Sequence, residues 1–431
     1  MIYKFLKWYA ALGIKFYYKN IFIQYNSNLP KTHPIIYASN HPSGFYESLV
    51  FATISKIAPI YLVRADYVSI KGLIWIFKIL KLYPIYRQSE GLKDVSKNNE
   101  VFNLLYNELA AKTPVCIYPE GTTKFNFRIR TIKKGISRLA IGAKKNGIRD
   151  IKIAPIAFNF VEPVKFRSNL FILSSDLMSL DHIDGEQLNN PTSLRALTIE
   201  IEKKMREVVL DLDSKEQHEL YQRLQLLFVN DNFAITGKSG YIKNSELPEK
   251  VNNLSNKIKK LDEKSFYELN KKTIKYFSEL NDNKTNDRAV ISNKNTLIDS
   301  MLFIFGYPLY ILGILVNAIP ILFALNIQKN KIKQYEYKTV VTVLIAQFSY
   351  IIYLLLLLVL SLFIFSTLGL IVLTFPFLAW YSLKFYDFKN NYLAINNFTK
   401  SQNKDYLVKL RAEIGDIIRQ WGTHEKRAIF N

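Results

Sequence analysis

The sequence predicts an α/β domain with a mostly buried, mixed sheet flanked by helices, preceded by an interfacial N-terminal helix and followed by C-terminal α-helical membrane hairpins. Two observations indicate this class. Apolar runs alternate with helix-like stretches between residues 25 and 235, the pattern of a sheet covered by helices. Residues 301–325 and 339–383 contain no charged side chain, which is typical of membrane segments. The 431 residues also exceed the usual size of one compact core, so we expect at least two structural units.

The charge of the chain narrows its possible partners. Lys and Arg total 58 against 36 Asp and Glu, a formal net charge of +22, which favours polyanions. The uncharged segments favour anionic lipid over nucleic acid as that partner, and we expect no nucleic-acid binding. The one cysteine, Cys116, excludes an intramolecular disulfide, and its apolar neighbours predict that it packs in a core.

Residues 1–24 are predicted to form an amphipathic helix that lies in a membrane interface. Aromatic and apolar side chains are mixed there with lysines: Phe5, Trp8, Tyr9, Leu12, Phe16 and Tyr17 with Lys4, Lys7, Lys15 and Lys19. The alternative is a helix that caps a soluble core, since apolar spacing alone does not separate the two. The first residues lack the long apolar core and cleavage site of a signal peptide, so we expect no secretion.

Residues 25–235 are predicted to form the α/β domain. Its expected strands are the apolar runs at residues 35–38, 60–63, 115–118, 151–160 and 170–174. Its expected helices are residues 47–56, 70–82, 95–111 and 134–145. Ligand sites in open α/β sheets commonly form where loops converge at strand ends, so the polar motifs that follow these runs are candidate site residues.

The rest of the chain divides by composition. Residues 236–297 are predicted to form a solvated, polar helical insert. Residues 298–384 are predicted to form membrane-embedded hairpins, and residues 385–431 a basic cytoplasmic tail near anionic lipid.

Within the predicted membrane part, residues 301–325 are interrupted by Pro308, Gly313 and Pro320 and followed at once by lysines. Positively charged loops tend to stay in the cytoplasm, so we expect a broken, re-entrant helical hairpin that returns to the cytoplasmic side. The alternative is a single kinked crossing.

The next uncharged stretch, residues 339–383, is too long for one crossing of about 20 residues. We therefore expect two helices joined near Ser366–Gly369, with both ends cytoplasmic.

The first candidate motif is Ser39–Glu47, which places an imidazole about one helical turn before a carboxylate. Imidazole titrates near neutrality, so His41 can act as a general base. A carboxylate on its other ring nitrogen would fix the tautomer and stabilise the imidazolium, and Glu47 is the candidate. In the alternative, His41 only forms hydrogen bonds in a surface loop and Glu47 is favoured by a helix N-terminus.

The second motif, Glu120-Gly121-Thr122-Thr123, follows the apolar run at residues 115–118 and supplies an acceptor, a turn and hydroxyl donors. The basic run after it suits a phosphate: Lys124, Arg128, Arg130, Lys133 and Lys134. The alternative is an ordinary turn followed by a solvated basic helix. Together the two motifs suggest acyl transfer onto a phosphorylated alcohol, because a hydroxyl needs a base as it attacks a thioester.

Two arginines between the motifs, Arg64 and Arg87, are candidates for phosphate binding, since each follows an apolar run. We favour Arg87. Arg64 has an alternative role as an ion-pair partner of Asp66 or Glu90.

These pieces, in this order, resemble the glycerolphosphate and lysophosphatidic acid acyltransferase family over roughly residues 20–235. Four segments carry the resemblance: Asn40-His41-Pro42 with Glu47, Pro84–Arg87, Tyr118–Thr123 and Ala154–Ala157. The resemblance implies that His41 is the base, that Glu47 is its partner, and that the glycerol phosphate is held by Arg87, Glu120, Gly121 and Thr122. Residues 306–320 are also similar to membrane segments of some bacterial and fungal members.

The chain departs from the family pattern at two places. Five residues separate His41 from Glu47 where the family has four before an aspartate, and Tyr46 stands in the expected place. A longer acid with one extra turn residue would restore the geometry. Thr123 replaces the arginine that commonly follows Gly-Thr, so the phosphate charge must be met by Lys124, Arg128 or Arg87.

The resemblance implies transfer of a fatty acyl chain from acyl-CoA or acyl-ACP to lysophosphatidic acid or glycerol 3-phosphate, with no metal or other cofactor. Its expected partners are membrane lipids, the acyl thioester donor and acyl carrier protein, at a bacterial inner membrane with the catalytic domain on the cytoplasmic face. Two alternatives remain: an acyltransferase for a lyso-aminolipid hydroxyl, and a non-catalytic lipid-binding membrane scaffold, which the altered His41 to Glu47 spacing motivates.

Overall fold

The computed structural model describes residues 1–25, 29–65, 74–86, 98–184, 190–238, 240–292 and 294–420. The chain forms two compact units. The first, here called the sheet unit, comprises Met1–Asp211, Gly240–Asn252 and Gln334–Val340. The second, here called the helical unit, comprises Leu212–Ser239, Asn253–Lys333 and Val341–Asn431.

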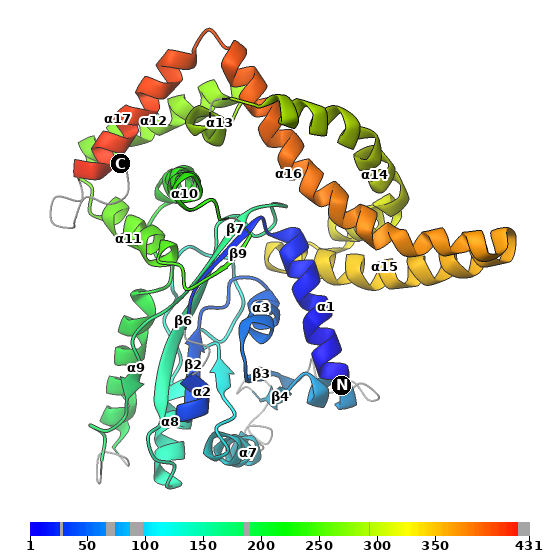
Figure 1. The fold of residues 1–431 in the computed structure, drawn as a ribbon. Helices are drawn as coiled ribbons and strands as arrows, with labels where there is room; N and C mark the ends of the chain where they lie inside the picture. Colours follow the sequence, from blue (N-terminus) through cyan, green and yellow to red (C-terminus); the bar gives the residue numbers. More distant parts are fainter. Residues whose placement is uncertain are drawn as a thin grey trace. The chain divides into compact units, whose positions relative to one another are not determined.

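The sheet unit is built on one mixed sheet, which has nine strands within the described residues (Figure 1). The order is β4-β3-β5-β2-β6-β7-β1-β9, and β8 pairs with β6 off this path. The strands are β1 Asn20–Gln24, β2 Ile35–Ser39, β3 Ile60–Arg64, β4 Leu82–Ile85, β5 Val115–Ile117, β6 Lys152–Phe160, β7 Asn169–Ser174, β8 Met178–Ser179 and β9 Tyr241–Lys243. Neighbours pair in parallel except β6 with β7 and with β8, so the predicted mixed sheet is confirmed.

Successive side chains of a strand point to opposite faces of the sheet, so each face contributes to its own apolar core. Ile36 and Ala38 of β2 belong to a core cluster with α7, α8 and α9. Tyr37, between them, packs edge-on against Phe51 of α3 with ring centroids 4.8 Å apart. Because both faces are covered, the central strands are almost wholly buried, as their near-continuous apolar sequences predict.

Helices cover both faces of the sheet, with α1 and α3 on one side and α8 and α9 on the other (Figure 1). The helices of this unit are α1 Ile2–Tyr17, α2 Leu29–Thr32, α3 Tyr46–Ile54, α5 Ile74–Ile79, α7 Asn98–Ala110, α8 Gly135–Lys145 and α9 Pro191–Arg206. Sequence signals set the start of α9: Pro191 occupies its first turn, and the Asn190 side chain accepts from the backbone N–H of Thr192 at 2.9 Å.

Helix α1 has one buried and one exposed apolar face, so burial alone does not separate the two alternatives predicted for it. Ala10, Ile14 and Tyr17 are buried, and the helix packs against α3. Its other face leaves large apolar side chains exposed: Ile2, Phe5, Trp8 and Leu12. The predicted helix ends earlier than expected, however, because residues 20–24 form β1 between β7 and β9.

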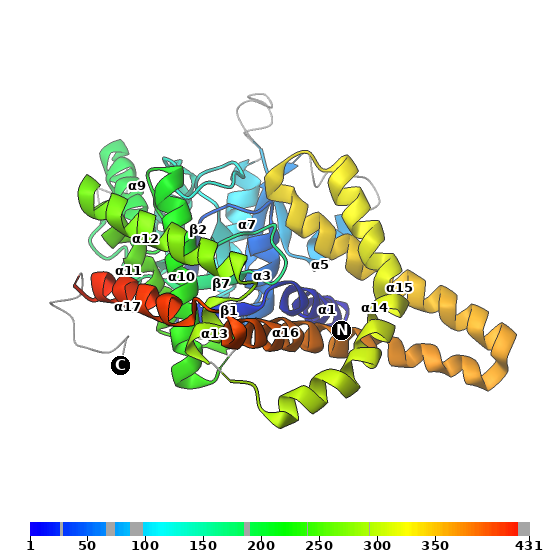
Figure 2. The same ribbon diagram turned by 90° about the horizontal axis from the view of Figure 1, so that it is seen from above.

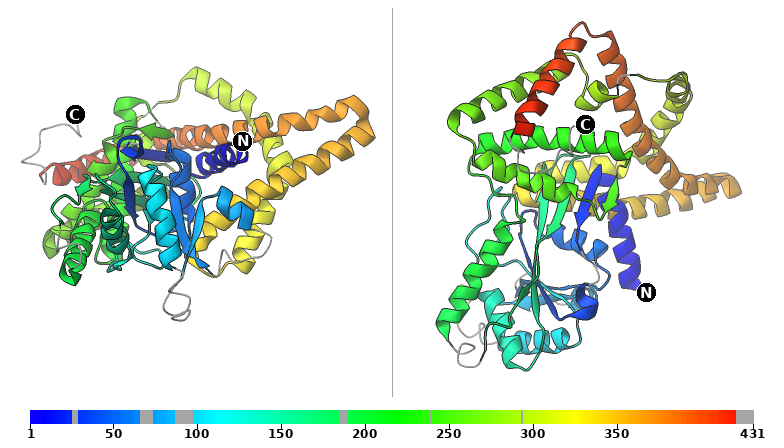
Figure 3. Two further views of the ribbon diagram at one scale, coloured as in Figure 1. Left: turned by 90° about the horizontal axis from the view of Figure 1, so that it is seen from below. Right: turned by 60° about the vertical axis from the view of Figure 1, so that its left-hand side comes forward.

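The helical unit contains α10 Lys215–Thr236, α12 Glu263–Asp282, α13 Asp287–Ile291, α14 Leu297–Lys331, α15 Tyr335–Phe365, η3 Ser366–Thr374, α16 Phe375–Lys400 and α17 Lys404–Gln420. Helix α11, Leu247–Lys259, and the start of α15 are shared with the sheet unit. Helices α14 and α16 pack along each other, and α12 and α17 lie side by side (Figure 3).

Helix α14 corrects the re-entrant hairpin predicted for residues 301–325, because it runs without a break through Pro308 and Pro320. A helical proline removes the hydrogen bond to the carbonyl four residues earlier, which for Pro320 is that of Val316. The hydroxyl of Tyr353 in α15 donates to the Val316 carbonyl at 2.7 Å. This neighbouring side chain satisfies the freed carbonyl, so the apolar helix tolerates the proline.

The joint predicted in residues 339–383 is confirmed, because α15 ends at Phe365 and α16 begins at Phe375 (Figure 2). The 3₁₀ segment between them starts at Ser366, whose φ is +50°. Gly369 lies so close to α15 that a Cβ there would overlap the backbone of Ser361, whose hydroxyl donates to the Gly369 carbonyl at 3.0 Å. Within the described residues, α14 and the α15–α16 segment are the two stretches long and apolar enough to cross a membrane.

Two further predictions need correction. Residues 241–243, placed in the polar insert, form the edge strand β9, and residues 212–235, placed in the α/β domain, belong to the helical unit. The predicted basic tail is helical as far as Gln420, and α17 buries Leu407, Leu410 and Ile414.

Candidate active site

The two sequence motifs meet at one edge of the sheet. Strands β2 and β5 are parallel neighbours with Ala38 opposite Ile117, so their carboxyl ends lie side by side. His41 follows the first strand and Glu120 follows the second. The backbone N–H of His41 donates to Glu120 Oε1 at 3.3 Å, and the backbone N–H of Lys124 donates to the His41 carbonyl at 3.3 Å.

His41 and Glu47 are in contact through His41 Nδ1 and Glu47 Oε1. The Glu47 side chain is fully buried, whereas 17% of the His41 side chain is exposed. Glu47 Oε2 also accepts from the backbone N–H of Ser43 at 3.2 Å. A carboxylate only accepts hydrogen bonds, so in a neutral imidazole this contact selects the tautomer with the hydrogen on Nδ1 and the lone pair on Nε2.

The extra residue between His41 and Glu47 is absorbed by two successive left-handed residues, Gly44 at φ +52° and Phe45 at φ +64°. Phe45 is the N-cap of α3, so Glu47 lies in the first helical turn and faces back towards His41. Tyr46, which stands where the family has its acid, is buried in the core against Tyr18. The predicted contact between imidazole and carboxylate is therefore present despite the altered spacing.

Tyr118 fixes the plane of the imidazole. The two rings stack with centroids 4.3 Å apart and an interplanar angle of 17°. The Tyr118 hydroxyl is hydrogen bonded to Ser48 Oγ at 2.5 Å, and burial raises its pKa well above the usual value. The ring is thus held between helix α3 and the second loop, and it limits rotation of the histidine.

Comparison with known proteins identifies this part of the chain. Residues 20–159 match the Acyltransferase family model. The chain carries an acyltransferase domain. The match spans the strands β1 to β5, nearly all of β6, and both loops that meet at His41.

One solved structure has a distant similarity to this chain. It is the 1-acyl-sn-glycerophosphate (LPA) acyltransferase, PlsC, from Thermotoga maritima, at 13% sequence identity and a TM-score of 0.34, covering 47% of this chain and 79% of that one. No curated protein shows a significant match to the chain.

In the acyltransferase domain, Glu120 joins the two loops instead of facing an open anion site. Its Oε2 accepts from Arg130 Nε at 2.6 Å, while its Oε1 accepts from His41. The negative charge of Glu120 would repel a phosphate, so Glu120 supports phosphate binding by orienting Arg130. The role predicted for Glu120 in holding the glycerol phosphate stays a prediction.

Arg130 is the central cation of the second loop. Its two terminal nitrogens donate to the hydroxyl and to the carbonyl of Thr122. Gly121, at φ +71°, forms the turn before Thr122, and the Lys133 side chain lies against it. The loop therefore gathers two cations and a threonine hydroxyl around Gly121 and Thr122. Thr123 is half-buried and Lys124 is exposed on the same loop.

The two predicted arginines of the acyltransferase domain have different outcomes. Arg64 is the last residue of β3, which pairs with β5, so it lies at the same edge of the sheet as the two loops. Arg87 lies outside the described residues.

Three residues at the site were missed or underrated in the sequence. Arg130 is one of five basic residues between positions 124 and 134, and the sequence does not distinguish it from the other four. Tyr118 reads as the end of an apolar run. Glu336 accepts from the backbone N–H of Phe125 at 3.1 Å, and it is 211 positions away in sequence, so no local signal points to it.

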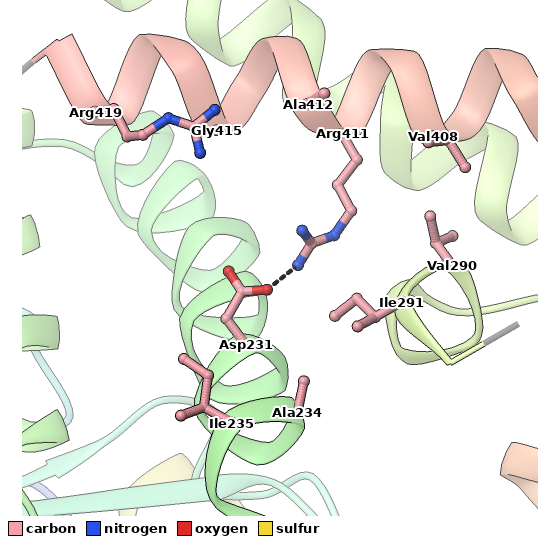
Figure 4. Close-up of a pocket in the computed structure, with 10 residues that line it drawn as sticks. All are labelled: Asp231, Ala234, Ile235, Val290, Ile291, Val408, Arg411, Ala412, Gly415 and Arg419. Carbon is pink, nitrogen blue, oxygen red and sulfur yellow. Dashed lines mark hydrogen bonds and ion pairs between the residues drawn. The ribbon is translucent and has the colours of Figure 1, made fainter. Parts of the chain in front are cut away.

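The helical unit contains a separate cavity of about 370 Å³, which holds none of the predicted site residues (Figure 4). Apolar side chains surround an ion pair there, in which Arg411 donates to Asp231 at 2.6 Å. Burial raises the pKa of the Asp231 carboxyl, and Arg411 opposes this shift. The cavity is lined by Asp231, Ala234, Ile235, Val290, Ile291, Val408, Arg411, Ala412, Gly415 and Arg419.

Proposed function

We propose that the protein transfers a fatty acyl chain from an acyl thioester, acyl-CoA or acyl-ACP, to the hydroxyl of lysophosphatidic acid or glycerol 3-phosphate in phospholipid synthesis. The observation that carries the proposal is the His41 ring, held at Nδ1 by the buried Glu47 and stacked on Tyr118. The ring lies next to the loop between β5 and α8, hereafter called the cationic loop. The acyltransferase domain supplies the reaction class.

The mechanism uses Nε2 of His41 as general base. It takes the proton from the acceptor hydroxyl as that oxygen attacks the thioester carbonyl carbon. The carbonyl then re-forms, the carbon–sulfur bond breaks, and the imidazolium returns its proton to the departing thiolate. Glu47 holds the ring tautomer and stabilises the imidazolium between these two steps. The scheme needs no metal or cofactor.

The acceptor phosphate is proposed to bind the loop of Thr122–Lys124, with Arg130, Lys133 and Lys124 as its cations. Arg64 and Arg87 are proposed as further ligands from the neighbouring strand ends. The alternative of a non-catalytic membrane scaffold was based on the altered spacing of His41 and Glu47. Because the two side chains are in contact, the spacing no longer supports that alternative.

The protein is proposed to act at the bacterial inner membrane with its catalytic domain on the cytoplasmic face. The apolar stretches of α14 and α15–α16 support membrane association, and lysines flank both. The exposed apolar face of α1 supports contact with the lipid surface, where a lysolipid acceptor would be presented.

The test is acyl transfer by purified protein in lipid nanodiscs. Acyl-CoA or acyl-ACP is supplied with glycerol 3-phosphate, lysophosphatidic acid or a lyso-aminolipid, and product is measured by mass spectrometry. His41→Ala is expected to lower kcat/KM on the order of a hundredfold or more, the usual loss for a general base. His182→Ala is the control, because His182 is exposed beside Glu200. Full turnover by His41→Ala would overturn the mechanism, and product from the lyso-aminolipid alone would overturn the proposed acceptor.

A further inference from the structure

The segment Gln334–Val340 lies between the two apolar stretches of the sequence, yet it belongs to the sheet unit. Helix α14 ends at Lys331 and α15 begins at Tyr335, so this segment is the last residue of the short connection and the first six residues of α15. It is hereafter called the 334–340 segment.

The 334–340 segment covers the end of the cationic loop. Glu336 Oε1 accepts from the backbone N–H of Phe125 at 3.1 Å, and the Tyr335 ring lies 5.2 Å from the Phe125 ring between centroids. Phe125 directly follows Lys124, whose backbone N–H donates to the His41 carbonyl. Two successive hydrogen bonds thus connect Glu336 to the histidine.

The same segment also packs against the His41 loop. A Cβ on Gly44 would lie 2.7 Å from the Tyr337 ring and 3.0 Å from the Glu336 carbonyl oxygen. This close approach leaves space only for glycine at the left-handed residue that brings Glu47 to His41. Both loops of the site therefore contact the 334–340 segment.

The far end of the segment is anchored in the interior of the sheet unit. The Thr339 hydroxyl donates to the Pro163 carbonyl at 2.6 Å, and Thr339 and Val340 are buried. A buried hydrogen bond and apolar contact fix its position, so its contacts with the loops are set by the fold.

We propose that the 334–340 segment is a positioning element for the active site and that Glu336 is its principal residue. By accepting from Phe125, Glu336 holds the cationic loop against the His41 loop, so the base and the phosphate cations stay at a fixed separation. The connection between the two apolar stretches thereby becomes part of the catalytic machinery without touching substrate. The activity arm of this proposal rests on the proposed acyl transfer, and the structural arm below does not.

The structural arm is hydrogen–deuterium exchange of the full chain in nanodiscs, followed in peptides that contain Phe125. Glu336→Ala is expected to raise the exchange rate of the Phe125 amide about tenfold or more, because that amide loses its acceptor. Glu336→Gln keeps a carbonyl oxygen and is expected to exchange within about twofold of the wild type. Glu200→Ala, which removes a half-buried carboxylate outside the candidate site, is the control. Unchanged exchange in Glu336→Ala would overturn the proposal.

The activity arm compares the same variants at equal folded fractions, checked by melting temperature. Glu336→Ala is expected to lower kcat/KM for the phosphorylated acceptor about tenfold, and Glu336→Gln to restore it to within about twofold. The pH at half-maximal rate is expected to stay unchanged, because His41 keeps its Glu47 partner. Equal activity of Glu336→Ala and wild type would overturn the positioning role. If His41→Ala keeps full activity while Glu336→Ala still shows raised exchange at Phe125, only the proposed reaction is overturned.

Discussion

Glu47 is the residue on which the chemistry of the candidate site depends. Its side chain is fully buried in the first turn of α3, and both oxygens accept hydrogen bonds, from His41 and from the backbone of Ser43. A buried carboxylate is stable only with such partners, and the helix N-terminus adds a favourable dipole. The arrangement therefore fixes the acid before any substrate binds.

The Glu47→Gln variant tests whether this charge acts on the histidine. The amide keeps the shape but can donate to Nδ1, which would place the ring hydrogen on Nε2, the wrong nitrogen for a base. We expect kcat to fall on the order of a hundredfold or more while KM changes little. Steady-state kinetics with acyl-CoA measure both constants. An unchanged kcat would show that Glu47 does not control the tautomer.

His218 in α10 links stability to pH. The residue is buried, and desolvation lowers the pKa of its imidazole from 6.5 to about 4. As the pH falls, the unfolded state binds a proton at His218 before the folded state does. The contribution of His218 to folding stability is therefore complete above pH 6.5 and is lost between pH 6.5 and about 4.

The His218→Leu variant is expected to flatten this dependence, because it removes the titrating group and keeps a similar volume. Apparent melting temperatures between pH 4 and 7 compare the two proteins. The wild type should lose more stability than the variant on acidification. Parallel curves would assign the acid sensitivity to carboxyl groups instead.

At the scale of elements, the site loops show what local sequence can predict. A histidine and an acid near a helix start follow from residue types and helical spacing, and so does the contact between them. The pairing of Glu120 with Arg130, and of Glu336 with the Phe125 amide, depends on the path of the backbone between them. No periodicity in the sequence contains that path.

Strands β1, β4, β8 and β9 are not among the predicted strands, and for β1 and β9 the physical reasons are clear. Strand β1, Asn20–Gln24, follows an amphipathic helix with the same mixture of aromatic and apolar residues, so the change of period is hidden in five residues. Strand β9, Tyr241–Lys243, has three residues in a polar stretch and gains its partner only when β1 is in place.

The joint between α15 and α16 is the element most sensitive to side-chain size. Gly369→Val is expected to open the hairpin, because any Cβ at this position overlaps the Ser361 backbone. Overpacking typically costs about 1–3 kcal/mol, so the apparent melting temperature in detergent should fall. The exposed neighbour Leu368→Val is the matched control and should melt like the wild type. Equal melting of both variants would argue against a close joint.

At the scale of the whole molecule, the presence of more than one unit and the order of the main elements were predictable, but the boundaries of the units were not. The sequence changes composition gradually near residue 235, whereas the sheet unit ends at Asp211 and later regains Gly240–Asn252 and Gln334–Val340. Tertiary packing determines which unit these short segments join, because each packs where its side chains are best buried. Lengths and hydropathy define the apolar helices, and only packing shows that Pro308 and Pro320 leave α14 unbroken.

Arg411 holds the helical unit together across three helices. From α17 it donates to Asp287 in α13 at 2.7 Å and to Asp231 in α10 at 2.6 Å. Burial lowers the pKa of the guanidinium, and the two carboxylates more than reverse that shift. Asp287 also accepts from the Tyr276 hydroxyl at 2.7 Å, so the network reaches α12.

The Arg411→Ala variant is expected to lower the free energy of unfolding by about 3–5 kcal/mol, because it leaves two buried carboxylates without their counter-ion. Denaturant unfolding and limited proteolysis of the full chain measure the change. Arg419→Ala, on the same helix and more exposed, is the control and should cost about 0–1 kcal/mol. Similar losses in both variants would show that the buried network adds no stability.

Cys116 has a practical consequence. It is fully buried in β5, and burial raises the pKa of its thiol well above the usual value, so the reactive thiolate is scarce and inaccessible. The wild-type protein therefore already behaves as a thiol-silent background. Single cysteines placed at Ser366 or Lys400 could be reacted with membrane-impermeant maleimides in intact cells and in inverted vesicles. The labelling pattern would show which side of the bilayer the α15–α16 joint and the C-terminal end of α16 each face.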